Sequence, residues 1–148
     1  MTKQSLPQTP RQIWMGLLAR AAPARLADLC PNLPQHELLR APEVGAVMVQ
    51  GRIGGTGQPF NLGEVTATRC ALRLGDLVGH AYVQGRDKDH ARRAAVLDAL
   101  MQGDQAPRIQ AQVVDVLHAE ETSRRRTRAA KAAATKVEFF TLVRGEDQ

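Results

Sequence analysis

The chain has 148 residues, a net charge of +5 and a hydrophobic content of 43% that includes only one Trp, one Tyr and three Phe. This length predicts a single domain, residues 1–148, with a modest core and with flexible tails at 1–8 and 146–148. No apolar run is long enough to cross a membrane, and the N-terminus lacks the apolar region of a secretory signal, so we expect a cytoplasmic protein.

The sulfur-containing and ionisable residues argue against several kinds of site. Cys30 and Cys70 lie far apart without a CxxC spacing, which favours buried, reduced thiols over a disulfide or a metal site. The four His residues are scattered, and we expect no metal. Residues 123–136 contain six basic residues and no acidic one, which leaves fourteen basic against fifteen acidic residues elsewhere. The excess positive charge is therefore confined to one segment.

The first third of the chain predicts two short helices followed by strands. Thr9 before a proline is typical of a helix start, and apolar residues at helical spacing predict a helix over 10–21. A second helix over 23–30 is ended by prolines. Residues 37–41 favour a short strand that the next proline ends, and the alternation at 46–53 predicts a longer strand.

A glycine-rich loop, Gly54-Gly55-Thr56-Gly57, separates that strand from a second strand at 66–74. Glycines allow positive φ angles and close approach of another backbone. No Gly-Lys-Ser or Gly-Lys-Thr follows the loop and no helix pattern opens after it, which excludes the usual nucleotide-binding loops. We therefore favour a long hairpin connection over a phosphate-binding loop.

The middle of the chain predicts a hairpin and then a helix. Gly75-Asp76 forms a tight turn, so residues 66–74 and 78–84 are expected to pair as an antiparallel hairpin. Asp87 is placed to cap a helix that runs to about residue 101 and packs on the sheet. His90 lies in the first turn, where a histidine at the core edge is favoured over a functional imidazole.

The last third is the hardest to interpret. Residues 109–117 fit a helix about as well as a short strand, and we favour the strand. Residues 118–136 lack large apolar side chains, which predicts an Ala/Arg-rich helix that is exposed or packed against a partner. A final strand at 137–143 would point Phe139 and Phe140 to opposite faces, so one of them needs a partner. The expected fold class is α+β, an antiparallel sheet of about four to five strands with helices packed on it.

Three blocks of sequence together carry a family resemblance. They are GGTGQPFNLGEVTATRCALRL, YVQGRDKDHARRAAVLDALMQ and AAATKVEFFTLVRG. In this order they closely resemble the G subunit of the bacterial carbon–phosphorus lyase core complex, and the likeness covers nearly the whole chain. The resemblance implies a role in using phosphonates as a phosphorus source.

The resemblance also implies partners and a substrate. The partners are the I, H and J subunits of a symmetric core, with the L subunit supporting the first step. In that step a methylphosphonate displaces adenine from the ribose C1′ of MgATP, a substrate of the complex. The I subunit is expected to carry the nucleosidase chemistry, and radical cleavage with an iron–sulfur cluster and S-adenosylmethionine belongs to the J subunit. No cofactor is implied for this chain.

The residues themselves offer no catalytic set. No nucleophile–base pair, metal set or carboxylate pair stands at a recognisable spacing. We therefore interpret the chain as a non-catalytic, assembly-forming subunit of a transferase complex rather than a phosphotransferase or nucleosidase that acts alone. The competing class is a nucleic-acid-binding module that uses residues 123–136, for which binding would fall steeply with salt.

One surface is expected to serve an inter-subunit site near bound nucleotide, because glycine amides, hydroxyls and guanidinium groups bind phosphate oxygens or carboxylates. Strand pairing would bring Arg69 next to Gly85, Arg86 and Asp87. The alternative is an internal ion pair of Arg69 or Arg86 with Asp87 or Glu64. The candidate binding or interface residues are Arg52, Gly54, Gly55, Thr56, Gly57, Thr66, Thr68, Arg69, Gln84, Arg86, Asp87, His90, Phe139 and Phe140.

Overall fold

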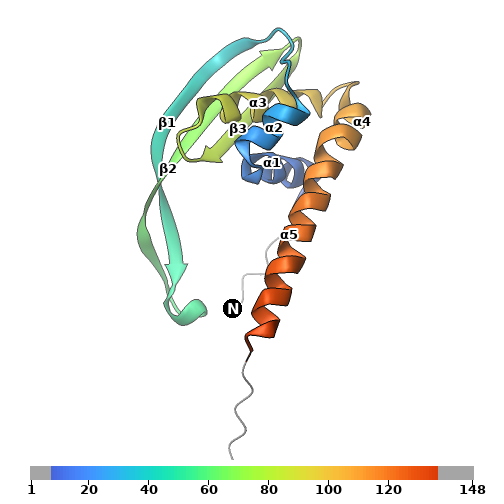
Figure 1. Cartoon of the computed structure of the whole chain (residues 1–148). Helices are drawn as coiled ribbons and strands as arrows, with labels where there is room; N and C mark the ends of the chain where they lie inside the picture. The colour runs from blue at the N-terminus through green and yellow to red at the C-terminus, as the bar shows by residue number, and fades with distance from the viewer. Residues whose placement is uncertain (1–7, 137–148) are drawn as a thin grey trace, which may run out of the picture. The chain divides into compact units, whose positions relative to one another are not determined.

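Figure 1 shows the computed structural model of the chain, which describes residues 8–136. The chain divides into a first compact unit that ends at His118 and a second that begins at Ala119. No helix within the described residues is both long and apolar enough to cross a bilayer. The elements are α1 (Pro10–Arg20), α2 (Pro23–Leu29), β1 (Glu37–Arg52), a 3-10 turn (Ile53–Gly55), β2 (Pro59–Leu74), β3 (Leu77–Gln84), α3 (Lys88–Leu100), α4 (Ala106–Ile109), a π-helical turn (Gln110–Val114) and α5 (Asp115–Ala134).

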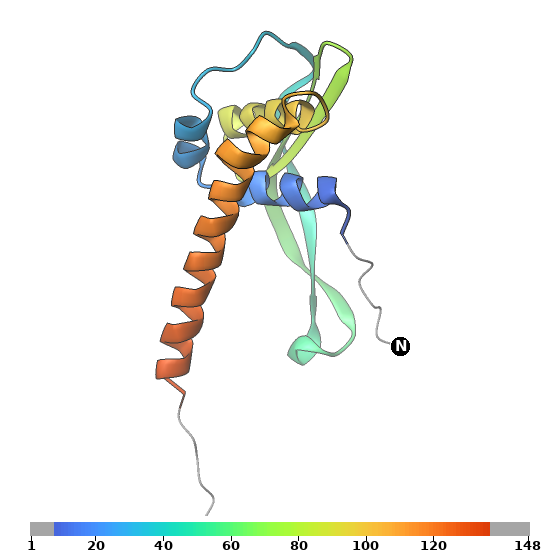
Figure 2. The same cartoon turned by 90° about the vertical axis from the view of Figure 1, so that its right-hand side faces the viewer.

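The first unit contains an antiparallel sheet with the strand order β1-β2-β3 (Figure 1). β1 and β2 pair along their whole length, from Glu37 opposite Arg73 to Arg52 opposite Pro59. β3 pairs only with residues 67–74 of β2, which confirms the predicted hairpin. Residues 44–65 form a two-stranded extension that we call the arm, and from Ala46 onward it lies beyond the end of β3. Figure 2 shows the arm continuing past β3 as a narrow ribbon.

The α+β class is confirmed, but the described residues form three strands rather than four or five. The strand expected at 37–41 is the beginning of β1 and does not end at Pro42. β1 is an edge strand, where a proline is tolerated, and register shifts between Leu38 and Glu43 absorb the irregularity. The strand expected at 137–143 lies outside the described residues.

The strand favoured at 109–117 is wrong, because this segment is helical. Ile109, Val113, Val114 and Leu117 are all buried, and their spacing places them on one side of a helix. The alternation of Val114 and Val116 made the apolar pattern look like a strand. The π-helical turn at Gln110–Val114 changes the local helical spacing at this point.

Both predicted helix starts are confirmed. The hydroxyl of Thr9 accepts a hydrogen bond from the amide of Gln12 at 3.3 Å, and the Gln12 side chain accepts one from the Thr9 amide at 2.8 Å. This reciprocal pair is a capping box. The carboxylate of Asp87 accepts a hydrogen bond from the His90 amide at 2.8 Å and caps α3. Side chains therefore satisfy amides that the first turns leave unpaired.

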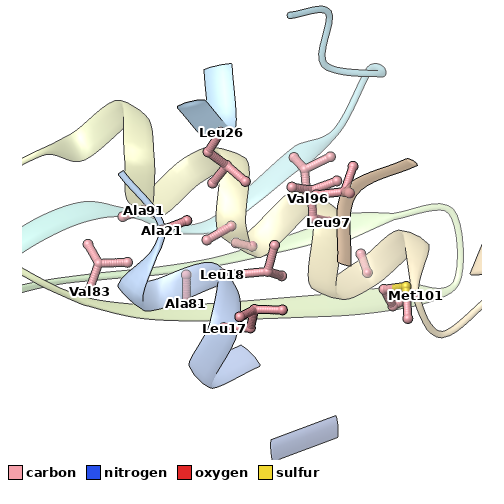
Figure 3. Packing of buried hydrophobic residues seen from close by; sticks show 14 of the residues in the cluster. Leu17, Leu18, Ala21, Leu26, Ala81, Val83, Ala91, Val96, Leu97 and Met101 are labelled. Atoms are coloured by element: carbon pink, nitrogen blue, oxygen red, sulfur yellow. The ribbon is translucent and has the colours of Figure 1, made fainter. Parts of the chain in front are cut away.

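The core lies where α1, α2 and α3 meet the three-stranded part of the sheet. Figure 3 shows Leu18 of α1, Leu26 of α2 and Leu97 of α3 within it, and all three are fully buried. α3 and the sheet approach each other closely at Gly79 of β3. A Cβ atom there would lie only 1.9 Å from the carbonyl oxygen of Ala95. α3 therefore packs directly on the backbone of β3.

Asp98 of α3 is a fully buried carboxylate that joins three elements. The guanidinium of Arg11 donates to its two oxygens at 2.7 and 3.2 Å, and the Trp14 indole donates at 2.9 Å. The backbone amide of His80 in β3 donates at 2.9 Å. The hydrogen bond to Asp98 also raises the pKa of Arg11. Together these bonds fix α1 and β3 to α3.

The second unit is described from Ala119 to Lys136 and consists of most of α5. It is helical as predicted, and from Ser123 onward every described residue is exposed. One ion pair joins Arg125 to Glu121 at 3.1 Å, one turn apart on the helix. Its alanine-rich composition favours a helix but gives little apolar surface to bury.

Gly79→Ala should lower the free energy of unfolding by about 1–3 kcal/mol or more, the usual cost of overpacking. The reason is that backbone atoms of α3 at 1.9 and 2.9 Å leave no room for the added Cβ. Denaturant unfolding of the isolated chain measures the effect. Gly45→Ala is the matched control, since a Cβ there would meet nothing within 4 Å. Equal unfolding midpoints for the two variants would contradict the close packing of α3 on β3.

Candidate functional site

The glycine loop forms the tip of the arm and is closed by its own hydrogen bonds. Gly54 and Gly55 have φ angles of +60° and +82°, which side chains other than glycine rarely adopt. The amide of Gly57 donates to the carbonyl of Ile53 at 2.8 Å, and Arg52 donates to the carbonyl of Gly57 at 3.1 Å. The loop therefore has the hydrogen bonding of a hairpin connection. Thr56, also in the predicted set, is exposed at this tip.

A second group of predicted residues fixes the turn between β3 and α3. The hydroxyl of the buried Thr68 donates to the carbonyl of Gly85 at 2.7 Å, and the amide of Gly85 donates to the carbonyl of Thr66 at 2.8 Å. Gly85 has a φ of +93°, and Asp87 follows as the cap of α3. Thr68 and Asp87 therefore stabilise the turn between β3 and α3.

His90 is buried and joins α3 to α1. Its Nε2 atom lies 2.9 Å from the carbonyl oxygen of Leu18. Because a carbonyl oxygen only accepts hydrogen bonds, Nε2 carries a proton in this arrangement. The imidazole therefore acts as a structural donor at the edge of the core.

Arg69 lies apart from the turn that it was expected to approach. It pairs with Tyr82 in the sheet, and its guanidinium binds Glu43 of β1 at 3.2 Å. The reason is the alternation of strand side chains, which places Arg69 on the opposite face from the buried Thr68. Glu43 also binds Arg40 at 3.1 Å, and these two arginines lower its pKa. The internal ion pair of Arg69 is therefore with Glu43, and neither Asp87 nor Glu64 takes that place.

The predicted residues consequently do not form one surface. Thr66 and the loop are separated by β2 residues 59–66, which span roughly 23 Å at about 3.3 Å per residue. The loop lies at the tip of the arm, whereas Thr66, Gln84 and His90 lie at its base. Arg86 is exposed beside that base and makes no hydrogen bond or ion pair with any residue from 8 to 136. Phe139 and Phe140 lie outside the described residues.

An open groove of about 620 Å³ lies at the base of the arm. The end of α1 forms one wall through Ala19 and Ala21, and β3 contributes Tyr82 and Gln84. Val47 and Val65 of the arm and His90 of α3 also line the groove. Most of this wall is apolar. Tyr82, whose surface is 56% exposed, was missed by sequence reasoning, although it is the only tyrosine of the chain.

The arm itself exposes large apolar side chains. Met48, Ile53 and Leu62 are 49%, 65% and 66% exposed, and the Phe60 ring lies against Gly51 with 42% of its surface exposed. Arg52 and Glu64 are the only charged residues of the arm. Sequence reasoning concentrated on the glycines and missed this surface. The signal that could have found it is the scarcity of charge between residues 44 and 65.

The described part of the chain also bears on catalysis. No group of three His, Cys, Asp or Glu side chains among residues 8–136 could hold a metal ion. Cys30 and Cys70 are free thiols, and burial raises the pKa of both, which keeps them protonated near neutral pH. The hydroxyl of Thr68 and the imidazole of His90 are bound to carbonyl oxygens. Both groups therefore take part in hydrogen bonds that stabilise the fold.

Comparison with known proteins assigns nearly the whole chain to one family. The family described as phosphonate metabolism protein PhnG matches residues 9–145. A protein of Rhizobium meliloti (strain 1021), the alpha-D-ribose 1-methylphosphonate 5-triphosphate synthase subunit PhnG, is 45% identical over 145 residues. That alignment covers 93% of this chain and 90% of the relative. The chain therefore belongs to the PhnG family of phosphonate metabolism proteins.

Proposed function

We propose that this chain is a non-catalytic, assembly-forming subunit of the carbon–phosphorus lyase core complex. Its partners in this proposal are the I, H and J subunits, with the L subunit acting in the same first step. There an alkylphosphonate oxygen bonds to the ribose C1′ of MgATP while the bond from C1′ to adenine breaks. Family membership and the relative described as a synthase subunit support the assignment. The two free thiols support a cytoplasmic location.

The exposed apolar arm is the observation that carries this proposal. A two-stranded hairpin is only marginally stable in water by itself, and β3 and its core do not extend over the arm. Ile53 and Leu62 nevertheless keep about two thirds of their surface exposed. Exposed apolar side chains with few charges are typical of the centre of a protein interface. Burial of each in a partner would contribute roughly 1–2 kcal/mol.

The groove extends the same surface toward the core. Val47 and Val65 belong to the arm and also line the groove, so the two features are continuous. Tyr82 adds an aromatic ring with a polar end, a residue type enriched at interfaces. A partner that held the arm could therefore also place a side chain in the groove. The proposal assigns both to a single interface with another subunit.

Replacing Ile53 and Leu62 together by Asp should weaken binding to the remaining core subunits by about ten-fold or more, because carboxylates are costly to bury in an apolar interface. Affinity of the purified chain for the other assembled subunits measures this. Ile13→Asp with Leu39→Asp is the control, since these large apolar residues are also exposed, by 49% and 45%, and lie outside the arm. If the arm variant binds no more weakly than the control, the arm is not the interface.

We also propose that Arg86 acts near the bound nucleotide, because it is exposed beside the groove and has no partner among residues 8–136. Arg86→Ala should lower turnover of the assembled complex without changing assembly. Arg69→Ala is the control, since its guanidinium is already bound to Glu43. The two measurements are the rate at which the complex releases adenine and the subunit stoichiometry of the complex. Equal turnover in both variant complexes would remove Arg86 from the site.

A further inference from the structure

The second unit carries a row of exposed cations on α5. Arg124, Arg128 and Lys131 stand three and four residues apart, so they lie on one face of α5. All three are exposed, and none forms an ion pair or hydrogen bond with a residue between 8 and 136. We call these three residues the cationic row. α5 runs through them as one unbroken helix (Figure 1).

The cationic row does not serve the helix itself. Like charges at these spacings repel one another and destabilise a helix by a few tenths of a kcal/mol per pair. The helix dipole favours cations only near the C-terminal turn, where Lys131 lies. Arg124 and Arg128 stand farther from that end. Glu120 and Glu121 precede Arg124 by one turn, but no acidic residue lies within one turn of Arg128, so local stability does not explain its charge.

We propose that the cationic row docks on a carboxylate-rich surface of another subunit of the synthase complex. The proposal rests on the proposed function, because it requires this chain to work within that complex. Arginine binds carboxylates through two parallel hydrogen bonds, so a row of three cations on one face fits a row of acidic side chains. The alanines at 129, 130 and 132–134, which surround Lys131, are small enough to allow a partner to approach closely.

A protein partner fits these residues better than a nucleic acid does. Residues 123–136 contain no Asn or Gln, which read adenine, and no aromatic side chain on which bases could stack. The rest of the chain holds fourteen basic and fifteen acidic residues, so the excess of positive charge is confined to this segment. A nucleic-acid binder usually presents a wider basic face. The isolated cationic row matches a local acidic patch on a protein.

The test uses the full chain with Arg124→Ala, Arg128→Ala and Lys131→Ala combined. Alanine favours helix, so α5 should persist, which circular dichroism checks. Its affinity for the remaining synthase subunits, assembled without this chain, is measured between about 50 and 300 mM NaCl, a range over which charge screening changes strongly. We expect affinity at low salt to fall about ten-fold or more, and to depend less on salt than that of the unmodified chain.

The matched control removes the same charge elsewhere, with Arg40→Ala, Arg73→Ala and Arg108→Ala combined, all exposed in the first unit. It should bind as the unmodified chain does. If the row variant and the control bind equally well, the proposal is wrong although the subunit role stands. If the unmodified chain does not bind the subunits at all, the proposed function itself fails. Tight binding of single-stranded or duplex DNA that only the row variant loses would instead assign the row to nucleic acid.

Discussion

The buried carboxylate of Asp98 is the contact on which the first unit depends. Its oxygens accept hydrogen bonds from Arg11 and Trp14 of α1 and from the backbone of β3. Breaking a buried ion pair typically lowers the free energy of unfolding by about 3–5 kcal/mol. The loss is smaller here, because 40% of the Arg11 side chain is exposed. Through this contact α1 is held against α3 and β3. The end of α1 then forms a wall of the groove, and the carbonyl of Leu18 accepts a hydrogen bond from the His90 imidazole.

The same packing explains why the arm is left uncovered. α3 contacts the sheet where three strands are present and where Gly79 lets the backbones meet. β3 ends at Gln84, which pairs with Ala67, so residues 46–65 have no third strand in their part of the sheet. Apolar side chains on such a ribbon cannot reach the core of their own unit. Exposed apolar side chains of this kind are typical of a surface that another chain covers, which is the role that we propose for the arm.

Local chemistry made much of the fold predictable. Thr9 and Asp87 predicted helix starts, because their side chains can cap the first turn. Gly75-Asp76 predicted the hairpin, because the turn needs a positive φ angle that glycine adopts easily. The contacts of Asp98 could not be foreseen, since its partners stand more than eighty residues away or belong to the backbone. Arg69 was misplaced because strand alternation turns it away from Thr68. Local spacing therefore predicted elements better than it predicted which side chains meet.

Hydrogen–deuterium exchange of backbone amides tests the central claim, that the arm is completed by another subunit. The isolated chain and the assembled complex would be compared at residues 44–65 and at residues 67–74. The account predicts rapid exchange of the arm in isolation and slowing by about a hundred-fold or more in the complex. Residues 67–74, which lie between two strands, should exchange slowly in both. Equal exchange of the arm amides in the two states would contradict the account.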